Sequence, residues 1–320
     1  MPDNLKSKKV VLIGPGAMGL EYYKVIKGLG ADLVAVVGRD KRGCDQFKHS
    51  TGVEPIPHGI LAWKKKERPK VDYAIVAVNI DQLRKTACEL MELGIKKILI
   101  EKPGGLRVDE IDEISKKSKA ANAKIYVAYN RRFYASVRKA KEFIVDDGGV
   151  TSFHFEFTEW SHLIPKEMPD DDEKKYLVLT NSSHVIDLAF YLGGAPKEIS
   201  LYQNDSVSWH PSAAVFAGAG QTVRGALFTY QANWNAPGRW GVEVLTRKHR
   251  LILRPLEELK VQKLRSLDIN NVRLDDKLDR QYKPGLYLQV KSFLNEEPTI
   301  LKSIEEQVEN ANLYSRMANY

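Results

Sequence analysis

The sequence predicts an α/β protein in which a doubly wound parallel sheet is followed by an α+β domain with a large open-faced, mostly antiparallel sheet. Up to about residue 130, short β-branched runs alternate with helical patterns, and beyond it come longer runs that alternate apolar and polar side chains. A chain of 320 residues is also longer than one compact core usually absorbs. We therefore expect one domain over residues 1–130 and a second over residues 131–320.

The elements expected in the first domain are short strands separated by helices. The strands are Lys9–Ile13, Leu33–Val37, Val71–Val78, Lys97–Glu101 and Lys124–Ala128, with helices near Ala17–Leu29, Asp81–Leu93 and Asp109–Ala121. Runs such as VDYAIVAV are apolar on both faces, which is typical of parallel strands covered by helices on both sides.

The second domain is expected to begin with a helix over Tyr134–Val145 that ends at the turn cluster DDGG. The runs VTSFHFEFTEW, TVRGALFTYQANW and WGVEVLTRKHRLILR then alternate with period two, so each buries one face of a sheet. Further helices are expected over Asn181–Leu192 and Ser303–Asn319. Because the other sheet face needs cover, we expect self-association as a homodimer or homotetramer.

Composition and charge exclude several classes of protein. The formal net charge is +8, but the basic residues are scattered in short groups without a nucleic-acid-binding signature, so no nucleic-acid partner is expected. The apolar stretches are too short to span a membrane, and residues 1–9 carry no signal-peptide core, so a cytoplasmic protein is expected. Two cysteines, Cys44 and Cys88, cannot build a four-sulfur site, and no metal is expected.

A glycine loop follows the first strand in KKVVLIGPGAMGLEYY. Gly14, Gly16 and Gly19 have the Gly-x-Gly-x-x-Gly spacing at the start of a helix, where it indicates a Rossmann dinucleotide-binding domain. The first glycine permits a tight turn, the second a close approach of pyrophosphate, and the third close packing of helix on strand. The residues expected to contact the cofactor here are Gly14, Pro15, Gly16, Ala17, Met18 and Gly19.

The end of the second strand bears on which dinucleotide binds. An acidic side chain that would hold the ribose 2′-hydroxyl of NAD is commonly found where this chain has Gly38, and Arg39 follows it. A guanidinium suits the 2′-phosphate of NADP, so NADP(H) is favoured over NAD(H). Asp40 leaves NAD open as an alternative, and it could equally cap the next helix.

With Glu101-Lys102-Pro103, Tyr129–Phe133 and the helix Asn181–Asp187, the order of motifs resembles the Gfo/Idh/MocA oxidoreductase family over almost the whole chain. The resemblance implies NAD(P)-dependent hydride transfer at a secondary alcohol or ketone of a sugar, cyclitol or sugar nucleotide. Reduction of a non-sugar substrate, of the dihydrodiol or tetrapyrrole type, is an alternative. A catalytically silent NADP-sensing regulator is another.

The resemblance also implies site residues. Lys102 would lie near the nicotinamide and the substrate hydroxyl, with Glu101 and Asn79 contacting the cofactor, and the peptide before Pro103 is expected to be cis. His184 would exchange the hydroxyl proton. Family members have an aspartate four residues before this histidine, where this chain has Thr180, so the proton relay would lack its carboxylate.

Four further residues are expected to contact substrate: Asn130, Arg131, Trp160 and Asn181. Arg131 could orient the cofactor, bind an anionic substrate group, or form an ion pair at the domain junction. Trp160 could stack on a sugar, although burial in the core is favoured for it.

Overall fold

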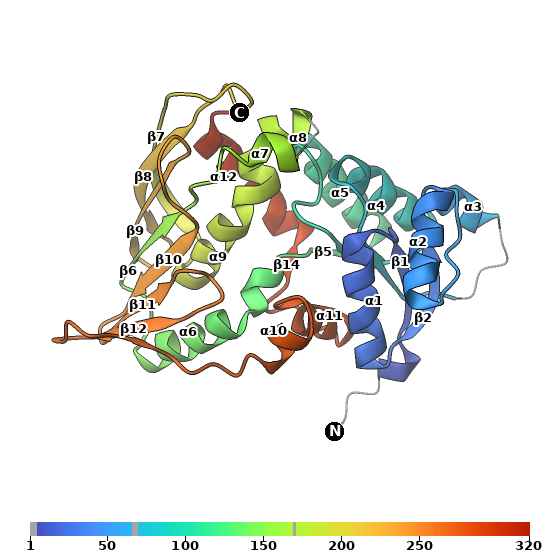
Figure 1. The fold of residues 1–320 in the computed structure, drawn as a ribbon, viewed down its shortest axis with the longest axis horizontal. Helices are drawn as coiled ribbons and strands as arrows, with labels where there is room; N and C mark the ends of the chain where they lie inside the picture. The colour runs from blue at the N-terminus through green and yellow to red at the C-terminus, as the bar shows by residue number, and fades with distance from the viewer. Residues whose placement is uncertain (1–4, 66–69, 169–170) are drawn as a thin grey trace. The chain divides into compact units, whose positions relative to one another are not determined.

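A computed structural model describes residues 5–65, 70–168 and 171–320 of the chain. The chain divides into two compact units, of which unit 1 is Met1–Asn130 with Arg280–Ala311 and unit 2 is Arg131–Asp279 with Asn312–Tyr320 (Figure 1). Residues 280–311, which follow the second sheet in the sequence, are therefore part of unit 1.

Unit 1 is built on a six-stranded sheet with the order β14-β5-β4-β3-β1-β2, in which only β14 is antiparallel to its neighbour. The strands are β1 Lys9–Ile13, β2 Asp32–Val37, β3 Tyr73–Val76, β4 Lys97–Ile100, β5 Lys124–Val127 and β14 Lys302–Ser303. β1, β3 and β4 are almost entirely buried, which accounts for their apolar runs. The predicted doubly wound sheet is confirmed.

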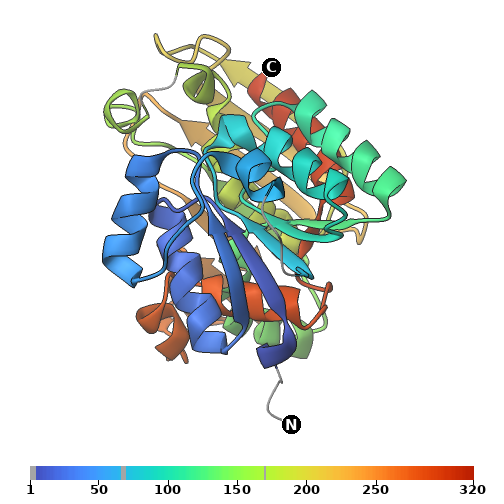
Figure 2. The same ribbon diagram turned by 90° about the vertical axis from the view of Figure 1, so that its right-hand side faces the viewer.

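Helices cover both faces of this sheet (Figure 2). α1 packs against α11, and α4 packs against α5. The helices are α1 Ala17–Leu29, α2 Lys41–Thr51, α3 Gly59–Lys64, α4 Leu83–Glu92, α5 Val108–Ala121 and α11 Leu286–Leu294, with short 3₁₀ turns η1 Leu5–Ser7 and η2 Ile80–Gln82. α12 follows at Ile304–Ala318 and α10 lies at Lys277–Gln281. α2 begins after Asp40, where the sequence analysis kept a helix cap as an alternative, whereas α3 falls where no helix was predicted.

Unit 2 contains an eight-stranded sheet with the order β13-β12-β11-β10-β6-β9-β8-β7, antiparallel except for the β6–β9 pair. The strands are β6 Ser152–Glu156, β7 Pro196–Asn204, β8 Val215–Thr222, β9 Leu227–Asn233, β10 Gly241–Leu245, β11 His249–Leu253, β12 Lys260–Lys263 and β13 Ile269–Asn271. The predicted mostly antiparallel sheet is confirmed.

One face of this sheet carries a row of stacked aromatic rings and is covered by helix. Phe153 stacks on Phe228, and Phe155 stacks on Tyr230, with Phe190 of α9 edge-on to Phe155. The helical segments of unit 2 are η3 Asn130–Phe133, α6 Ala135–Asp146, α7 Ile164–Glu167, α8 Asp171–Lys175, η4 Val178–Ser182 and α9 Ser183–Gly193. Aromatic pairs of this kind contribute beyond the area they bury, so this face forms the core of unit 2.

The opposite face of the same sheet is open within unit 2. Its side chains alternate with the buried ones along β9, and Ala217, Ala219, Thr229 and Gln231 are exposed on it. The face carries small and polar side chains at these positions, and the large apolar side chains of Tyr202 and Leu227 are also exposed on it, at 69% and 59%. The sequence analysis expected a face in need of cover, and within unit 2 these side chains have none. In the described ranges, the helices are all too short or too polar to cross a bilayer.

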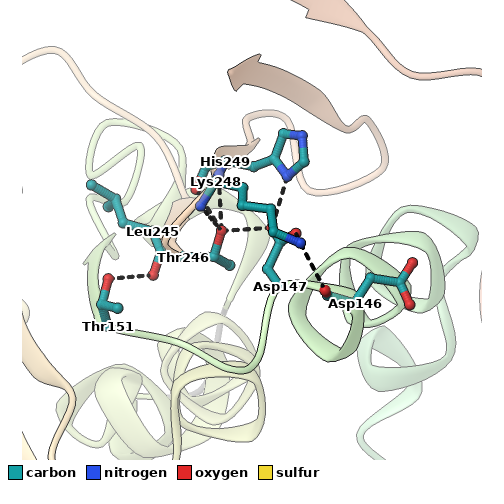
Figure 3. A network of polar contacts seen from close by, with 7 residues as sticks. All are labelled: Asp146, Asp147, Thr151, Leu245, Thr246, Lys248 and His249. Atoms are coloured by element: carbon teal, nitrogen blue, oxygen red, sulfur yellow. Dashed lines mark hydrogen bonds and ion pairs between the residues drawn. The ribbon is translucent and has the colours of Figure 1, made fainter. Parts of the chain in front are cut away.

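The turn between β10 and β11 is fastened to the end of α6 by Asp147 (Figure 3). Asp147 Oδ2 accepts hydrogen bonds from Thr246 Oγ1 and His249 Nδ1, each at 2.7 Å. Lys248 Nζ donates to the Asp146 carbonyl oxygen at 3.1 Å. The side chain of Asp147 is only 3% exposed, so this carboxylate links helix and hairpin from a buried position.

Candidate functional site

The glycine loop between β1 and α1 has the geometry that its spacing predicts. Gly14 has φ +104°, and a Cβ there would lie 2.3 Å from the Ala77 carbonyl oxygen. A Cβ at Gly19 would lie 2.0 Å from the Gly14 carbonyl oxygen, so helix and loop touch through this glycine. At Gly16 a Cβ would meet nothing within 4 Å. The open space at Gly16, beside the N-terminus of α1, fits the approach of a pyrophosphate.

A cavity of about 320 Å³ lies beside this loop, where β1, β2 and β3 end. Seven of the predicted cofactor residues line it: Gly14, Pro15, Gly16, Gly38, Arg39, Asp40 and Asn79. Ala17, Met18, Gly19, Glu101 and Lys102 do not line it. Ligands of open α/β sheets bind at the carboxyl ends of the strands, so a dinucleotide fits this cavity by both position and lining.

The sequence analysis missed a group of cavity residues that lie in α3 and α4 or directly before these helices. They are His58, Gly59, Ile60, Leu61, Gln82, Lys85, Thr86 and Glu89. His58 and Gly59 reach the cavity because Ile56 forms a parallel bridge with Val37, the last residue of β2. This segment carries no motif, and a single bridge leaves no periodic pattern in the sequence.

Gly38 and Asp40 are both constrained by their neighbours at the end of β2. A Cβ at Gly38 would lie 2.4 Å from Cys44 Sγ and 2.8 Å from Pro15 Cγ, so a side chain cannot be accommodated there without displacing these atoms. Asp40 caps α2, with Oδ1 accepting from the Gly43 amide at 2.8 Å. The Arg39 side chain is 70% exposed and its Nε lies 3.9 Å from Asp40 Oδ2.

The Glu101-Lys102-Pro103 segment follows β4, and the predicted cis peptide before Pro103 is confirmed. Glu101 Oε1 accepts from the Tyr22 hydroxyl at 2.7 Å. Burial raises the pKa of Glu101, and the hydrogen bond from Tyr22 partly offsets that effect. Gln307 Nε2 donates to the Pro103 carbonyl oxygen and the Tyr129 hydroxyl, each at 3.0 Å. The backbone that carries Lys102 is thus held within unit 1.

In unit 2, the segment predicted as one helix over Asn181–Leu192 has two parts. The turn η4, Val178–Ser182, is a π-helix, and the regular helix α9 begins only at Ser183. π-turns are rare in proteins, and those that occur often lie at functional sites. His184 lies in the first turn of α9, is 8% exposed, and has its ring centre 6.1 Å from that of Trp240.

A carboxylate that the sequence analysis missed, Glu159, lies beside this turn. It is buried, and its Oε1 accepts from Ser182 Oγ at 2.7 Å and from Asn181 Nδ2 at 3.2 Å. Burial raises the pKa of Glu159, and the hydrogen bond from Ser182 acts against that shift. The alternation along β6 gave no signal for Glu159, because this residue lies beyond the end of that strand.

Two arginines and two tryptophans surround the same carboxylate. Arg239 Nη1 lies 3.5 Å from Glu159 Oε2, and its guanidinium is 4.7 Å from the ring centre of Trp160 and 4.9 Å from that of Trp240. Arg131 also lies over the Trp240 ring, at 4.9 Å. Trp160 is 49% exposed, so its favoured assignment to the core was wrong. It directly follows buried Glu159 in the segment after β6.

Two further residues discussed in the sequence analysis, Asn130 and Thr180, form hydrogen bonds to nearby backbone carbonyl groups. Asn130 Nδ2 donates to the Pro284 carbonyl oxygen at 2.9 Å, within unit 1. The Thr180 hydroxyl is buried and donates to the Glu173 carbonyl oxygen at 3.1 Å. Thr180 therefore stabilises the backbone before η4, and the carboxylate present beside this turn comes from Glu159 instead.

Comparisons with known proteins agree with this geometry. Residues 8–129 match the family model GFO_IDH_MocA, described as an oxidoreductase family with an NAD-binding Rossmann fold. A curated relative, the myo-inositol 2-dehydrogenase of Thermotoga maritima, is 26% identical over 152 residues, which are 46% of this chain and 43% of that protein. The match thus spans less than half the length of that relative.

Two solved structures share the fold over nearly the whole chain. An oxidoreductase from Agrobacterium radiobacter, in complex with NAD⁺, L-tartaric acid and magnesium, has a TM-score of 0.78 at 13% identity and covers 98% of this chain and 96% of its own. The inositol dehydrogenase homolog from Azotobacter vinelandii, with NADH and myo-inositol, has a TM-score of 0.77 at 15% identity, covering 98% and 94%. The Rossmann part of the chain, residues 8–129, thus matches the Gfo/Idh/MocA oxidoreductase family.

Proposed function

We propose that this protein transfers a hydride between NAD(P) and a secondary alcohol or ketone of a sugar, cyclitol or sugar nucleotide. The observation that carries the proposal is the cavity at the strand ends, where the glycine loop leaves open space at Gly16. The substrate class is supported by the names of the relatives, two of which concern inositol.

NADP(H) is the proposed cofactor in preference to NAD(H). Arg39 is largely exposed at the rim of the cavity, and an acidic residue is excluded at Gly38 by Cys44 and Pro15. Asp40, the remaining candidate for a ribose hydroxyl, already accepts the capping hydrogen bond of α2. A guanidinium without a competing carboxylate at position 38 favours a 2′-phosphate.

In the proposed reaction, the bound nicotinamide supplies or accepts the hydride. Lys102 stabilises the negative charge that develops on the substrate oxygen, and the His184 imidazole exchanges the hydroxyl proton. Support for His184 comes from its burial in the first turn of α9, next to the π-turn. Four residues are proposed to contact the substrate: Asn130, Arg131, Trp160 and Asn181.

Unit 1 is proposed to bind the dinucleotide, and unit 2 is proposed to bind the substrate. Unit 2 is also proposed to mediate self-association as a homodimer or homotetramer. The support for self-association is the sheet face that unit 2 leaves open. It carries small side chains such as Ala217 and Ala219, over which a second flat surface could pack closely.

The test is cofactor reduction or oxidation, followed at the nicotinamide absorbance, with a panel of cyclitols, sugars, nucleotide sugars and their ketones. We expect turnover with at least one member. The matched control is Gly16→Val, whose side chain would fill the pyrophosphate space without meeting a protein atom at its Cβ, so the fold should persist while turnover is lost. Tight NADP(H) binding with no turnover on any carbonyl or alcohol would favour a silent sensor instead.

A further inference from the structure

The indole of Trp240 in unit 2 is contacted by two positively charged guanidinium groups. The guanidinium carbons of Arg131 and Arg239 each lie 4.9 Å from its ring centre. Arg239 also lies 4.7 Å from the ring centre of Trp160. Two positive charges therefore share one aromatic ring, an arrangement in which each guanidinium repels the other.

The carboxylates nearby do not balance these two charges equally. Glu159 pairs with Arg239 at 3.5 Å and is otherwise held by Asn181 and Ser182. Arg131 has a buried Nε with no hydrogen-bond partner within the described part of the chain. Glu257 is exposed and acts on Arg131 only through space, as Glu159 also does. The pKa of Arg131 is lowered, chiefly by burial.

A buried guanidinium donor without an acceptor is costly, because its hydration is lost and no hydrogen bond replaces it. Neighbouring Arg132 shows the alternative, since both of its donating nitrogens reach the buried Asp187. The chain thus supplies Arg132 with a carboxylate and leaves the Nε of the adjacent Arg131 without an acceptor among the described residues, so an acceptor from a ligand would complete it. An oxyanion, which binds a guanidinium in two-point fashion, is the group that completes this site.

Trp160 adds a surface for the remainder of such a ligand. It is 49% exposed, adjoins buried Glu159, and is kept in place by the guanidinium of Arg239. The C–H face of a sugar ring packs well on an indole. A large exposed aromatic ring beside a half-buried cation fits a ligand that has an apolar face and an acidic group.

We propose that the cluster of Arg131, Arg239, Trp160 and Trp240 binds an oxyanion, a carboxylate or phosphate, carried by the carbohydrate substrate. Arg131 pairs with the oxyanion, Arg239 adds its charge, and Trp160 packs against the sugar ring. This assignment rests on the proposed function and narrows its substrate class to acidic carbohydrates.

The test is calorimetric binding to the full chain, alone and with saturating NADP⁺, of ligands that differ only in the acidic group. The pairs are D-glucuronate against D-glucose and D-galacturonate against D-galactose, with D-glucose 6-phosphate as the phosphate arm. We expect at least one acid to bind roughly tenfold or more tightly than its neutral partner, the scale of a charge-assisted hydrogen bond. Arg131→Gln should bring that ratio close to one.

The matched control is Arg224→Gln, which removes the same charge from an exposed position of unit 2 and should leave the ratio unchanged. If Arg131→Gln does not fold, Arg239→Gln makes the same comparison. A preference for carboxylates alone or for phosphate alone identifies which oxyanion is bound. Equal affinity within every pair, no binding of any acid, or a preference that survives the substitution would overturn the proposal. The proposed function fails separately, by absence of turnover with every member of the substrate panel.

Discussion

Asp187 and Arg132 form a two-point ion pair in the interior of unit 2. Arg132 Nε donates to Asp187 Oδ2 at 2.7 Å and Nη2 donates to Oδ1 at 2.6 Å. The two side chains are 9% and 1% exposed. The pair joins η3 to α9, so it fixes the helix that begins next to His184 relative to the segment that carries Arg131.

We expect Asp187→Asn to destabilise the protein by about 3–5 kcal/mol, because it leaves the charge of Arg132 buried without a counter-charge. The measurement is the free energy of unfolding in urea. The control is Glu142→Gln, which breaks the exposed pair with Lys139 on α6 and should cost less than about 1 kcal/mol. Similar losses in the two variants would contradict a special role for the buried pair.

The second prediction concerns cofactor preference. The unmodified protein should bind NADP(H) at least several-fold more tightly than NAD(H), and Arg39→Asp should erase or reverse that preference through repulsion of the 2′-phosphate. Calorimetry with both cofactors measures it. Lys116→Asp, on the exposed side of α5, makes the same charge change away from the cavity and should have no such effect. Equal affinities for both cofactors in the unmodified protein would defeat the prediction.

The third prediction is that an acid cannot simply be restored at the end of β2. Gly38→Asp should lower the melting temperature and weaken binding of both cofactors, because even its Cβ collides with Cys44 and Pro15. Thermal unfolding and NAD⁺ titration measure the two effects. Gly43→Ala, whose Cβ would lie 3.5 Å from Asp40 Oδ1, is a nearby control that should fold normally. A stable Gly38→Asp protein with tight NAD⁺ binding would show that the packing at position 38 can relax.

The fourth prediction separates chemistry from cofactor binding. His184→Asn and Lys102→Met should each lower turnover by roughly 10²-fold or more, with little change in cofactor affinity, as expected for proton transfer and charge stabilisation in the transition state. Steady-state kinetics and cofactor titration measure them, with exposed Lys124→Met as control. If His184→Asn instead raises the Michaelis constant and leaves turnover nearly intact, His184 positions the substrate and is not the acid/base.

The fifth prediction concerns acid sensitivity of the turn in Figure 3. Burial alone would raise the pKa of Asp147, but hydrogen bonds from Thr246 and His249 lower it overall. A carboxylate with a lowered pKa stabilises the fold above its unfolded pKa of about 3.9, and this contribution is lost as the pH falls through the folded value. Asp147→Asn should therefore cost most at pH 7 and progressively less below pH 4, measured by urea unfolding across that range. A cost independent of pH would mean that only the hydrogen-bonding geometry matters.

Prediction from the sequence succeeded for helices and strands whose residues repeat a periodic pattern. It failed where the local structure depends on one residue. The helix α1 and the aromatic alternation of β6 were predicted because periodicity is averaged over many positions. The π-turn η4 was not, because one extra residue in a turn leaves the apolar pattern of α9 unchanged. Trp160 was assigned to the core, but it lies beyond the end of β6, where strand alternation no longer decides which side chains are buried.

Part of the candidate site was likewise predictable from the sequence, and part of it was not. The glycine loop was predictable because each glycine is required by a contact of backbone with backbone, and such requirements leave a fixed spacing. The cluster around Trp240 combines Arg131, Glu159 and Arg239 from separate segments, so no local motif records it. The pairing of β6 with β10 brings the segment after β6, which carries Glu159, close to the segment before β10, which carries Arg239.

The return of residues 280–311 to unit 1 has a consequence for synthesis of the chain on the ribosome. β14 supplies an edge of the six-stranded sheet, and Phe293 of α11 packs edge-on against Tyr73 and Tyr126. When the first 130 residues emerge, these aromatic surfaces have no cover, and the segments that cover them are translated almost last. The nucleotide-binding unit must therefore wait, partly assembled, for the end of translation, which is the period in which chaperones would be needed most. A nonsense codon late in the gene would therefore remove β14, the edge strand of the six-stranded sheet of unit 1.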